Sequence, residues 1–244
     1  MSAELLDRRA LAALRFVHGV DGTPVGRALN LVAPGARLVR NRGGDWVLLG
    51  AADFDDYSAS FDPVPAVAQS LLTLDVSDPL GEFLPRRIRL ALPRDADPAQ
   101  ALSADSVFQP VRIALYPAPA ARAEHDWARL HTALQTAAGA PARHALIRVE
   151  RTSDDSLLAL ALTDARGEAL VAISGIPLTP WEEADGPVLG NDIEVRVSAF
   201  HDPAVASFPD PDDLDARRAL LATTSAVIRI AASRAQSLAL RLNA

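Results

Sequence analysis

The sequence predicts an all-β protein built from two tandem antiparallel β-sandwiches, with a short N-terminal helix or arm and a C-terminal helix plus β-hairpin. Two observations lead to this prediction. Short apolar or alternating runs recur along most of the chain and are separated by turn residues, which is the pattern of a sandwich or barrel. A frame of five residue types also occurs twice at one offset of about 117 residues, which indicates a repeated unit. The matched pairs are Gly22/Gly139, Pro24/Pro141, Ala28/Ala145, Leu29/Leu146 and Val32/Val149.

The composition sets limits on the class of protein. With 244 residues and 49% hydrophobic residues, the chain is long enough for two domains with sizeable cores. It has no cysteine, which excludes disulfides, thiolate metal sites and cysteine nucleophiles. The 24 basic and 31 acidic residues are interspersed, and the net charge is −7, so neither nucleic acid nor an anionic membrane is expected as the partner. We expect a cytoplasmic protein, because no apolar run is long enough to cross a bilayer and no signal peptide is recognisable.

Residues 1–13 are expected to form an N-terminal arm, since Leu5, Leu6 and Leu11 have roughly helical spacing with charged residues between them. Residues 14–95 are assigned to the first β-sandwich, in which Asp21-Gly22 and Gly43-Gly44 supply hairpin turns. Its expected strands are the runs at 14–20, 28–32, 36–40, 45–51, 57–61, 71–76 and 86–93.

Residues 96–110 are expected to be a linker or covering loop, because the segment between Pro93 and Pro110 is rich in small and polar residues and shows no strand alternation. Residues 111–205 are assigned to the second β-sandwich. Its expected strands are the runs at 111–117, 127–136, 145–151, 157–164, 168–173 and 192–200.

The tail, residues 206–244, is expected to contain a short helix and a pair of strands. Asp212 or Asp213 can cap a helix that runs to Leu221, with acidic residues in its first turn. The alternating runs at 225–231 and 237–242 are expected to close one of the sandwiches or to form a docking hairpin.

The polar residues that could carry chemistry give no established motif. The acidic cluster Asp210, Asp212, Asp213 and Asp215 lacks the glycine and the final glutamate of an EF-hand loop, so a capped helix start is favoured over a calcium site. The cluster Asp53, Asp55 and Asp56 is assigned no role. The five histidines, none of which lies in a zinc-binding motif, are His18, His125, His131, His144 and His201. Of these, His125 and His131 are an even number apart and could share one strand face.

The sequence does not indicate the other common classes of site either. No serine has the surroundings of a nucleophile elbow, and "RNRGGDW" is not a phosphate-binding loop. Trp46, Trp127 and Trp181 could line a sugar-binding face, although Trp46 has the neighbours of a core residue. We therefore expect no catalytic, cofactor-binding or metal-binding residues, no cofactor, and no enzymatic activity.

The repeated frame resembles the carboxypeptidase regulatory-like, or transthyretin-like, β-sandwich. That family's pattern is a Gly-x-Pro turn, a strand that begins with a small residue, and later a Thr-Asp-x-x-Gly turn. Thr163, Asp164 and Gly167 match the later turn in the second copy, whereas the first copy departs from it with Arg40, Asn41 and Gly44. The resemblance implies two immunoglobulin- or transthyretin-like sandwiches.

The order of runs also resembles accessory proteins of phage-tail-like contractile injection systems, over roughly residues 14–205. This resemblance implies a non-catalytic structural subunit, a cap or accessory adaptor that binds neighbouring protein subunits through its terminal arms and sheet edges. It is compatible with a homo-oligomer and with a cytoplasmic location as part of an assembled particle. The alternative hypothesis is a carbohydrate- or cell-surface-binding module.

Overall fold

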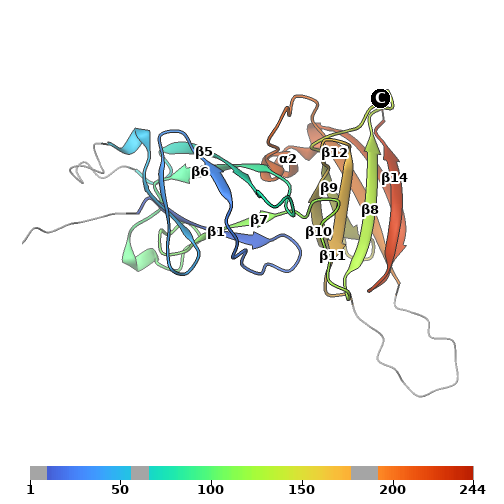
Figure 1. Ribbon diagram of the computed structural model, residues 1–244, viewed down its shortest axis with the longest axis horizontal. Coiled ribbons are helices and arrows are strands. Elements are labelled where there is room, and N and C mark those ends of the chain that lie inside the picture. The colour runs from blue at the N-terminus through green and yellow to red at the C-terminus, as the bar shows by residue number, and fades with distance from the viewer. Residues whose placement is uncertain (1–9, 56–65, 177–191, 244) are drawn as a thin grey trace, which may run out of the picture. The chain divides into compact units, whose positions relative to one another are not determined.

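The computed structural model describes residues 10–55, 66–176 and 192–243, and within them the protein is all-β (Figure 1). Fourteen strands form four sheets, and the one α-helix of these residues, α2 (Pro211–Ala216), is short. The chain divides into two compact units. The first comprises residues 1–17, 23–76 and 87–114, and the second comprises residues 18–22, 77–86 and 115–244.

The first unit contains a sheet of order β3-β4-β1-β7 and a sheet of order β2-β5-β6. β4 pairs antiparallel with both β1 and β3. The segment 96–110 connects β6 to β7 within this unit and includes a 3-10 helix, η2 (Pro98–Gln100). The strands are β1 (Ala12–His18), β2 (Asn30–Val32), β3 (Arg37–Arg40), β4 (Trp46–Gly50), β5 (Ser70–Ser77), β6 (Arg86–Leu92) and β7 (Val111–Leu115).

The second unit contains a sheet of order β10-β9-β12-β13 and a sheet of order β11-β8-β14. All of its strand pairs are antiparallel except β8 with β14, which run parallel. The strands are β8 (Ala128–Gln135), β9 (Leu146–Arg151), β10 (Leu157–Leu162), β11 (Glu168–Ile173), β12 (Ile193–His201), β13 (Ala222–Ile230) and β14 (Ala235–Arg241).

The two units share one strand order with a single exception. When the strands of each unit are numbered one to seven along the chain, the first unit has sheets 3-4-1-7 and 2-5-6, and the second has sheets 3-2-5-6 and 4-1-7. Strands four, one and seven therefore stay together in both units, as do strands two, five and six. The third strand alone changes sheet, because β3 pairs with β4 whereas β10 pairs with β9.

The first turn of the repeated frame is the same in both copies of the frame. Gly22 and Gly139 both have positive φ, at 74° and 84°, which glycine adopts without the steric cost of a Cβ atom. Pro24 forms an isolated antiparallel bridge back to the preceding strand, and Pro141 does the same. The frame diverges further along, since Val32 is 61% exposed at the end of a three-residue strand whereas Val149 is fully buried.

The later turn of the frame is also repeated. The backbone N–H of Asn41 donates to the Asp45 carbonyl oxygen, and the backbone N–H of Asp164 donates to the Glu168 carbonyl oxygen, both at 2.8 Å. In each turn the side chain of the first residue accepts from the backbone N–H of the last, at 2.9 Å in the first unit and 3.0 Å in the second. The Asn-for-Asp difference between the copies therefore leaves the turn unchanged.

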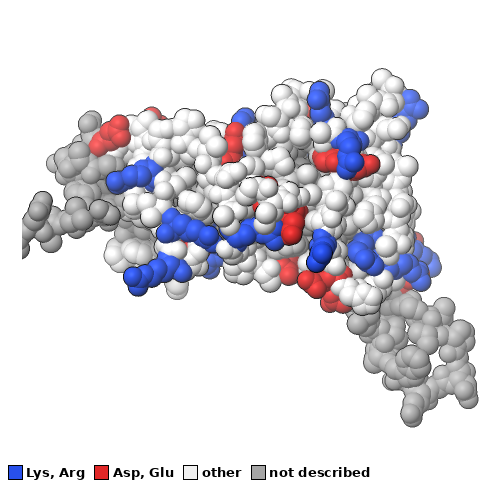
Figure 2. Space-filling model, in the orientation of Figure 1, with Lys and Arg blue, Asp and Glu red and all other residues white. Residues whose placement is uncertain are grey.

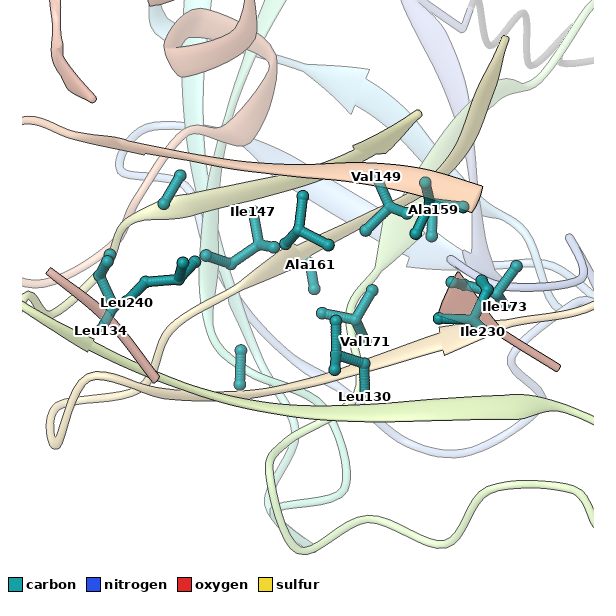
Figure 3. Packing of buried hydrophobic residues seen from close by; sticks show 14 of the residues in the cluster. Leu130, Leu134, Ile147, Val149, Ala159, Ala161, Val171, Ile173, Ile230 and Leu240 are labelled. Carbon is teal, nitrogen blue, oxygen red and sulfur yellow. The ribbon is translucent and has the colours of Figure 1, made fainter. Parts of the chain in front are cut away.

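The core of the second unit lies between its two sheets (Figure 3). β8 shows the alternation that produces it, because Leu130 and Leu134 are buried while His131 and Ala133 between them are exposed. Figure 3 shows these leucines on one side of the core and Ile147 on the other. Burying each such side chain contributes about 1.5–3 kcal/mol, so the aliphatic layer is the main source of stability in this unit.

Every described strand overlaps an expected run, but β7, which was expected to begin the second sandwich, belongs to a sheet of the first unit. The expected strand at 57–61 and most of the N-terminal arm, residues 1–9, lie outside the described residues. Ala12 is not helical as the arm predicted, because it begins β1 and is fully buried. The two C-terminal strands do not form a hairpin. β13 extends one sheet and β14 extends the other, so together they complete the second sandwich.

Candidate functional site

The acidic cluster of the tail forms the start of α2. Asp210, and not Asp212 or Asp213 as predicted, is the N-cap, and its side chain accepts a hydrogen bond from the Asp213 backbone N–H at 3.2 Å. The shift has a simple reason, since Pro211 has no N–H to contribute and favours the first helical position, which leaves the residue before it as the cap. The acidic residues of the first turn, Asp212 and Asp213, are placed as predicted.

The remaining carboxylates of this cluster are paired with arginines. Asp212 Oδ2 lies 2.6 Å from Arg86 Nη2, and Asp215 Oδ1 lies 2.9 Å from Arg148 Nη1. Because the Arg148 side chain is only 14% exposed and projects from β9, its pair with Asp215 holds the helix against the sheet. Among the residues that the structure describes, no group of three acidic or histidine side chains could hold a metal ion.

Arg86 and Tyr116 form a buried cation–π contact near this helix. Arg86 is 1% exposed, and its guanidinium lies 5.9 Å from the centre of the Tyr116 ring. Burial raises the pKa of Tyr116 to about 12, although the nearby Arg86 charge works in the opposite direction. A shifted pKa often marks an active site, but Tyr116 is only 3% exposed, so its environment is structural.

The histidines are dispersed. His18 packs against Phe83 and Trp127 with ring centres 5.3 Å apart in both cases. His131 lies in β8, but His125 precedes that strand, so the two do not share a strand face as the sequence suggested.

His144 and His201 form a second group. His144 has a positive φ of 59°, and His201 is a largely buried residue at the end of β12. Burial is the main cause that lowers the pKa of each, and the neighbouring Arg143 charge adds to it. The folded state therefore favours the neutral form of both side chains.

The other singled-out acids and tryptophans do not assemble a site. Asp53 accepts a hydrogen bond from the Ser70 hydroxyl, and Asp56 lies outside the described residues. Trp46 is half-buried in β4, not a fully buried core residue as its neighbours suggested. Trp127 is 7% exposed, and Trp181 lies outside the described residues. Because neither described tryptophan presents a fully exposed ring, these side chains do not form a flat sugar-binding platform.

A cavity of about 450 Å³ lies against the sheet β11-β8-β14. Its polar lining includes His131 and Ser237, which are opposite each other in the β8–β14 register. No hydrogen bond joins these two side chains, so they do not form a nucleophile–base pair, and the lining contains no phenylalanine, tyrosine or tryptophan ring on which a sugar could stack. Arg166, also in the lining, is paired with Glu168 at 2.7 Å. The cavity thus has the volume of a ligand site without its chemistry.

On the face shown in Figure 2, basic and acidic side chains lie interspersed and leave wide uncharged areas between them. All 24 basic residues of the chain are arginines, and there is no lysine. Arginine forms two parallel hydrogen bonds to a carboxylate, and both the Arg15–Asp45 and the Arg87–Asp75 pairs have this form. The hydrogen bond from Arg15 is the main cause that lowers the pKa of Asp45.

One edge of the four-stranded sheet of the second unit is not paired with another described strand. β13 is the outer strand of the order β10-β9-β12-β13, and all nine of its residues pair with β12. Its sequence, ATTSAVIRI, contains one charged residue and neither proline nor glycine. Its backbone groups on the outer side are therefore available to a further strand, except where a described side chain already binds them.

The fold and these surfaces define an all-β, two-unit protein without a recognisable catalytic constellation in the described residues. No helix among them has the length and apolar character needed to span a membrane. No protein-family model matches the sequence, and a search of curated proteins returned no match. A solved structure described as "The Bacillus anthracis TIE protein" aligns with a TM-score of 0.27 and 10% identity. The alignment covers 88% of this chain and 34% of that one, and at this TM-score it supports no argument about fold or function.

Proposed function

We propose that this protein is a non-catalytic structural subunit, a cap or accessory adaptor of a phage-tail-like contractile injection particle. The observation that carries the assembly role is the open edge of β13, which offers backbone hydrogen bonds that no described backbone group satisfies. The particle itself is proposed from the sequence resemblance over residues 14–205. A transthyretin-like identity of the two sandwiches is part of the same proposal, and the two repeated turns support it.

The fold limits which segments of the subunit could bind its neighbours. The C-terminal strands are unsuited to act as a free docking arm, because β13 and β14 both pair within the second sandwich. Residues 1–9 and the β13 edge are then the two proposed contact regions. No feature of the described residues favours the alternative, carbohydrate binding.

The test is affinity purification of the tagged full-length protein from its native host, followed by mass spectrometry and negative-stain imaging. We expect tube, sheath or baseplate proteins to copurify, together with tail-like particles. A matched variant lacks residues 2–9. The deletion ends before the buried Leu11, which is 1% exposed, and before Ala12, so β1 is retained. Recovery of the full-length protein alone, from cells that contain such particles, would refute the proposal.

A further inference from the structure

We propose that β13 pairs with the β13 strand of a second copy of this chain, antiparallel and centred on Ser225, to form a two-fold symmetric dimer. This inference rests on the proposed assembly role and names one partner for its open edge.

Two hydrogen bonds establish which backbone groups of β13 point outward. The Glu194 carbonyl oxygen, in register with Arg229, accepts from the Thr152 backbone N–H and so faces β9. The Arg229 carbonyl oxygen accepts from the Gln236 side-chain amide at 2.9 Å and so faces away from β12. Because the direction alternates along an antiparallel ladder, the odd-numbered residues of β13 direct their N–H and C=O groups to the open side.

Gln236 also fixes where a partner can bind. Its amide already occupies the outward carbonyl of Arg229, at the C-terminal end of the edge. Within the described chain, no backbone group binds the outward groups of Thr223, Ser225 and Val227. These three residues have Ser225 at their centre, so the free stretch is symmetric about one residue.

A second copy fits this stretch in an antiparallel register. Ser225 then lies opposite Ser225 of the partner subunit, and Val227 lies opposite Thr223 of the partner subunit, in about six backbone hydrogen bonds. Val227 is 57% exposed in the single chain, and pairing with a threonine methyl group covers part of it. No charges face each other within the paired stretch, since Arg229 lies beyond it.

One other edge of the second unit, β10, is less suited to pairing. β10 has a register shift between Leu157 and Ala159, and such irregularities commonly protect sheet edges. The corresponding edge strand of the first unit, β6, has the sequence RRIRLAL and is protected by the half-buried Arg87 and the exposed Arg89. Among β6, β10 and β13, only β13 combines nine regularly paired residues with a nearly uncharged sequence.

A charge exchange at residue 225 tests both the edge and its register. Ser225 is exposed, so Ser225→Lys and Ser225→Glu are each tolerated by the single chain. In the symmetric register each variant places two like charges opposite each other, and we expect self-association to weaken about tenfold, as measured by analytical ultracentrifugation. An equimolar mixture of the two variants should form mixed dimers and regain the lost affinity, because opposite charges then face each other.

A thiol pair gives a second, independent measurement. The native chain has no cysteine, so Ser225→Cys introduces its only thiol. Opposite residues in an antiparallel pair are about 5.5 Å apart at Cα, which suits a disulfide, and mild oxidation should give a covalent dimer. Val227→Cys is the matched control on the same strand face. Its two copies would lie about 14 Å apart, so it should remain uncrosslinked.

The results separate this inference from the proposed function. Any of four results would overturn the symmetric pairing. The native protein could stay monomeric, or its dimer could be unchanged by Ser225→Lys. The mixture of the lysine and glutamate variants could fail to regain affinity, or the two cysteine variants could crosslink equally. Recovery of particle proteins is measured separately by the affinity purification. A dimer without particle proteins would therefore refute the proposed function alone.

Discussion

Thr163 holds the second repeated turn against the loop between β8 and β9, and its hydroxyl makes a testable contribution to stability. The residue is 1% exposed. Its Oγ1 donates to the Ala142 carbonyl oxygen at 2.7 Å and accepts from the Ala145 backbone N–H at 2.8 Å. Thr163→Val keeps the shape of the side chain, but it removes both bonds and leaves two buried backbone groups without a partner.

The expected cost follows from those two groups. An orphaned buried donor or acceptor costs about 1–3 kcal/mol, so the variant should lose about 2–6 kcal/mol of unfolding free energy. For a protein of this size each kcal/mol lowers the melting temperature by about 2–4 °C, so we expect a fall of at least about 4 °C. Urea denaturation followed by circular dichroism measures the first quantity, and thermal denaturation measures the second.

Thr132→Val is the matched control. Thr132 is also buried in the second unit, at 3% exposure, but its hydroxyl reaches only the Ala169 carbonyl oxygen at 3.5 Å, the outer limit of a hydrogen bond. We expect this variant to lose less than about 1 kcal/mol. Thr163→Ser should retain most of the native stability, because it keeps the hydroxyl. Equal losses in the two valine variants would show that the hydroxyl of Thr163 does not hold the turn.

Three further predictions concern turns and titrating groups. Gly167→Ala should destabilise the protein by about 2 kcal/mol more than Gly44→Ala in thermal denaturation. Both glycines have positive φ, but a Cβ atom at residue 167 would lie 2.5 Å from a backbone carbonyl oxygen, whereas its nearest neighbour at residue 44 is 3.8 Å away; equal losses would contradict this. The folded-state pKa of His201 lies below 6.5, so the unfolded chain binds the proton more tightly and stability should fall as pH drops below that value. His201→Gln should flatten this decline in urea midpoints, and an unchanged slope would assign it to other groups. In Tyr57→Phe, ultraviolet titration should show Tyr116 ionising near pH 12, and a transition near pH 10 in the folded protein would refute its burial.

The strands were predictable because their signals are local. Alternating residues and turn residues lie within a few positions of each other. The turns at Gly22 and Gly139 require a positive φ, which glycine supplies wherever the turn lies in the fold. The assignment of strands to sheets was not predictable in the same way. β3 and β10 occupy the same place along the chain, yet they pair with different neighbours, and such pairing depends on contacts between distant segments.

The candidate site shows the same division. The helix start was predicted to within a few residues. The predicted N-cap was wrong because Pro211 takes the first helical position, which makes Asp210 the cap. The partner of Asp212 was beyond local reasoning, because Arg86 lies 126 positions earlier in the chain. One usable signal was present, namely that all basic residues are arginines, which favours paired carboxylates over free cationic patches.

The two copies of the fold provide an internal comparison for the proposed assembly role. Strand six is an edge in both units, as β6 in the first and β13 in the second. In β6, Arg89 is exposed and the half-buried Arg87 makes a two-bond pair with Asp75, so this edge is charged in the manner that discourages strand addition. β13 has one charge in nine residues. Because the topology places both strands alike, the difference between them lies in their side chains. Of the two sixth strands, only β13 has a nearly uncharged edge, and this is the composition expected of an edge that is dedicated to one contact.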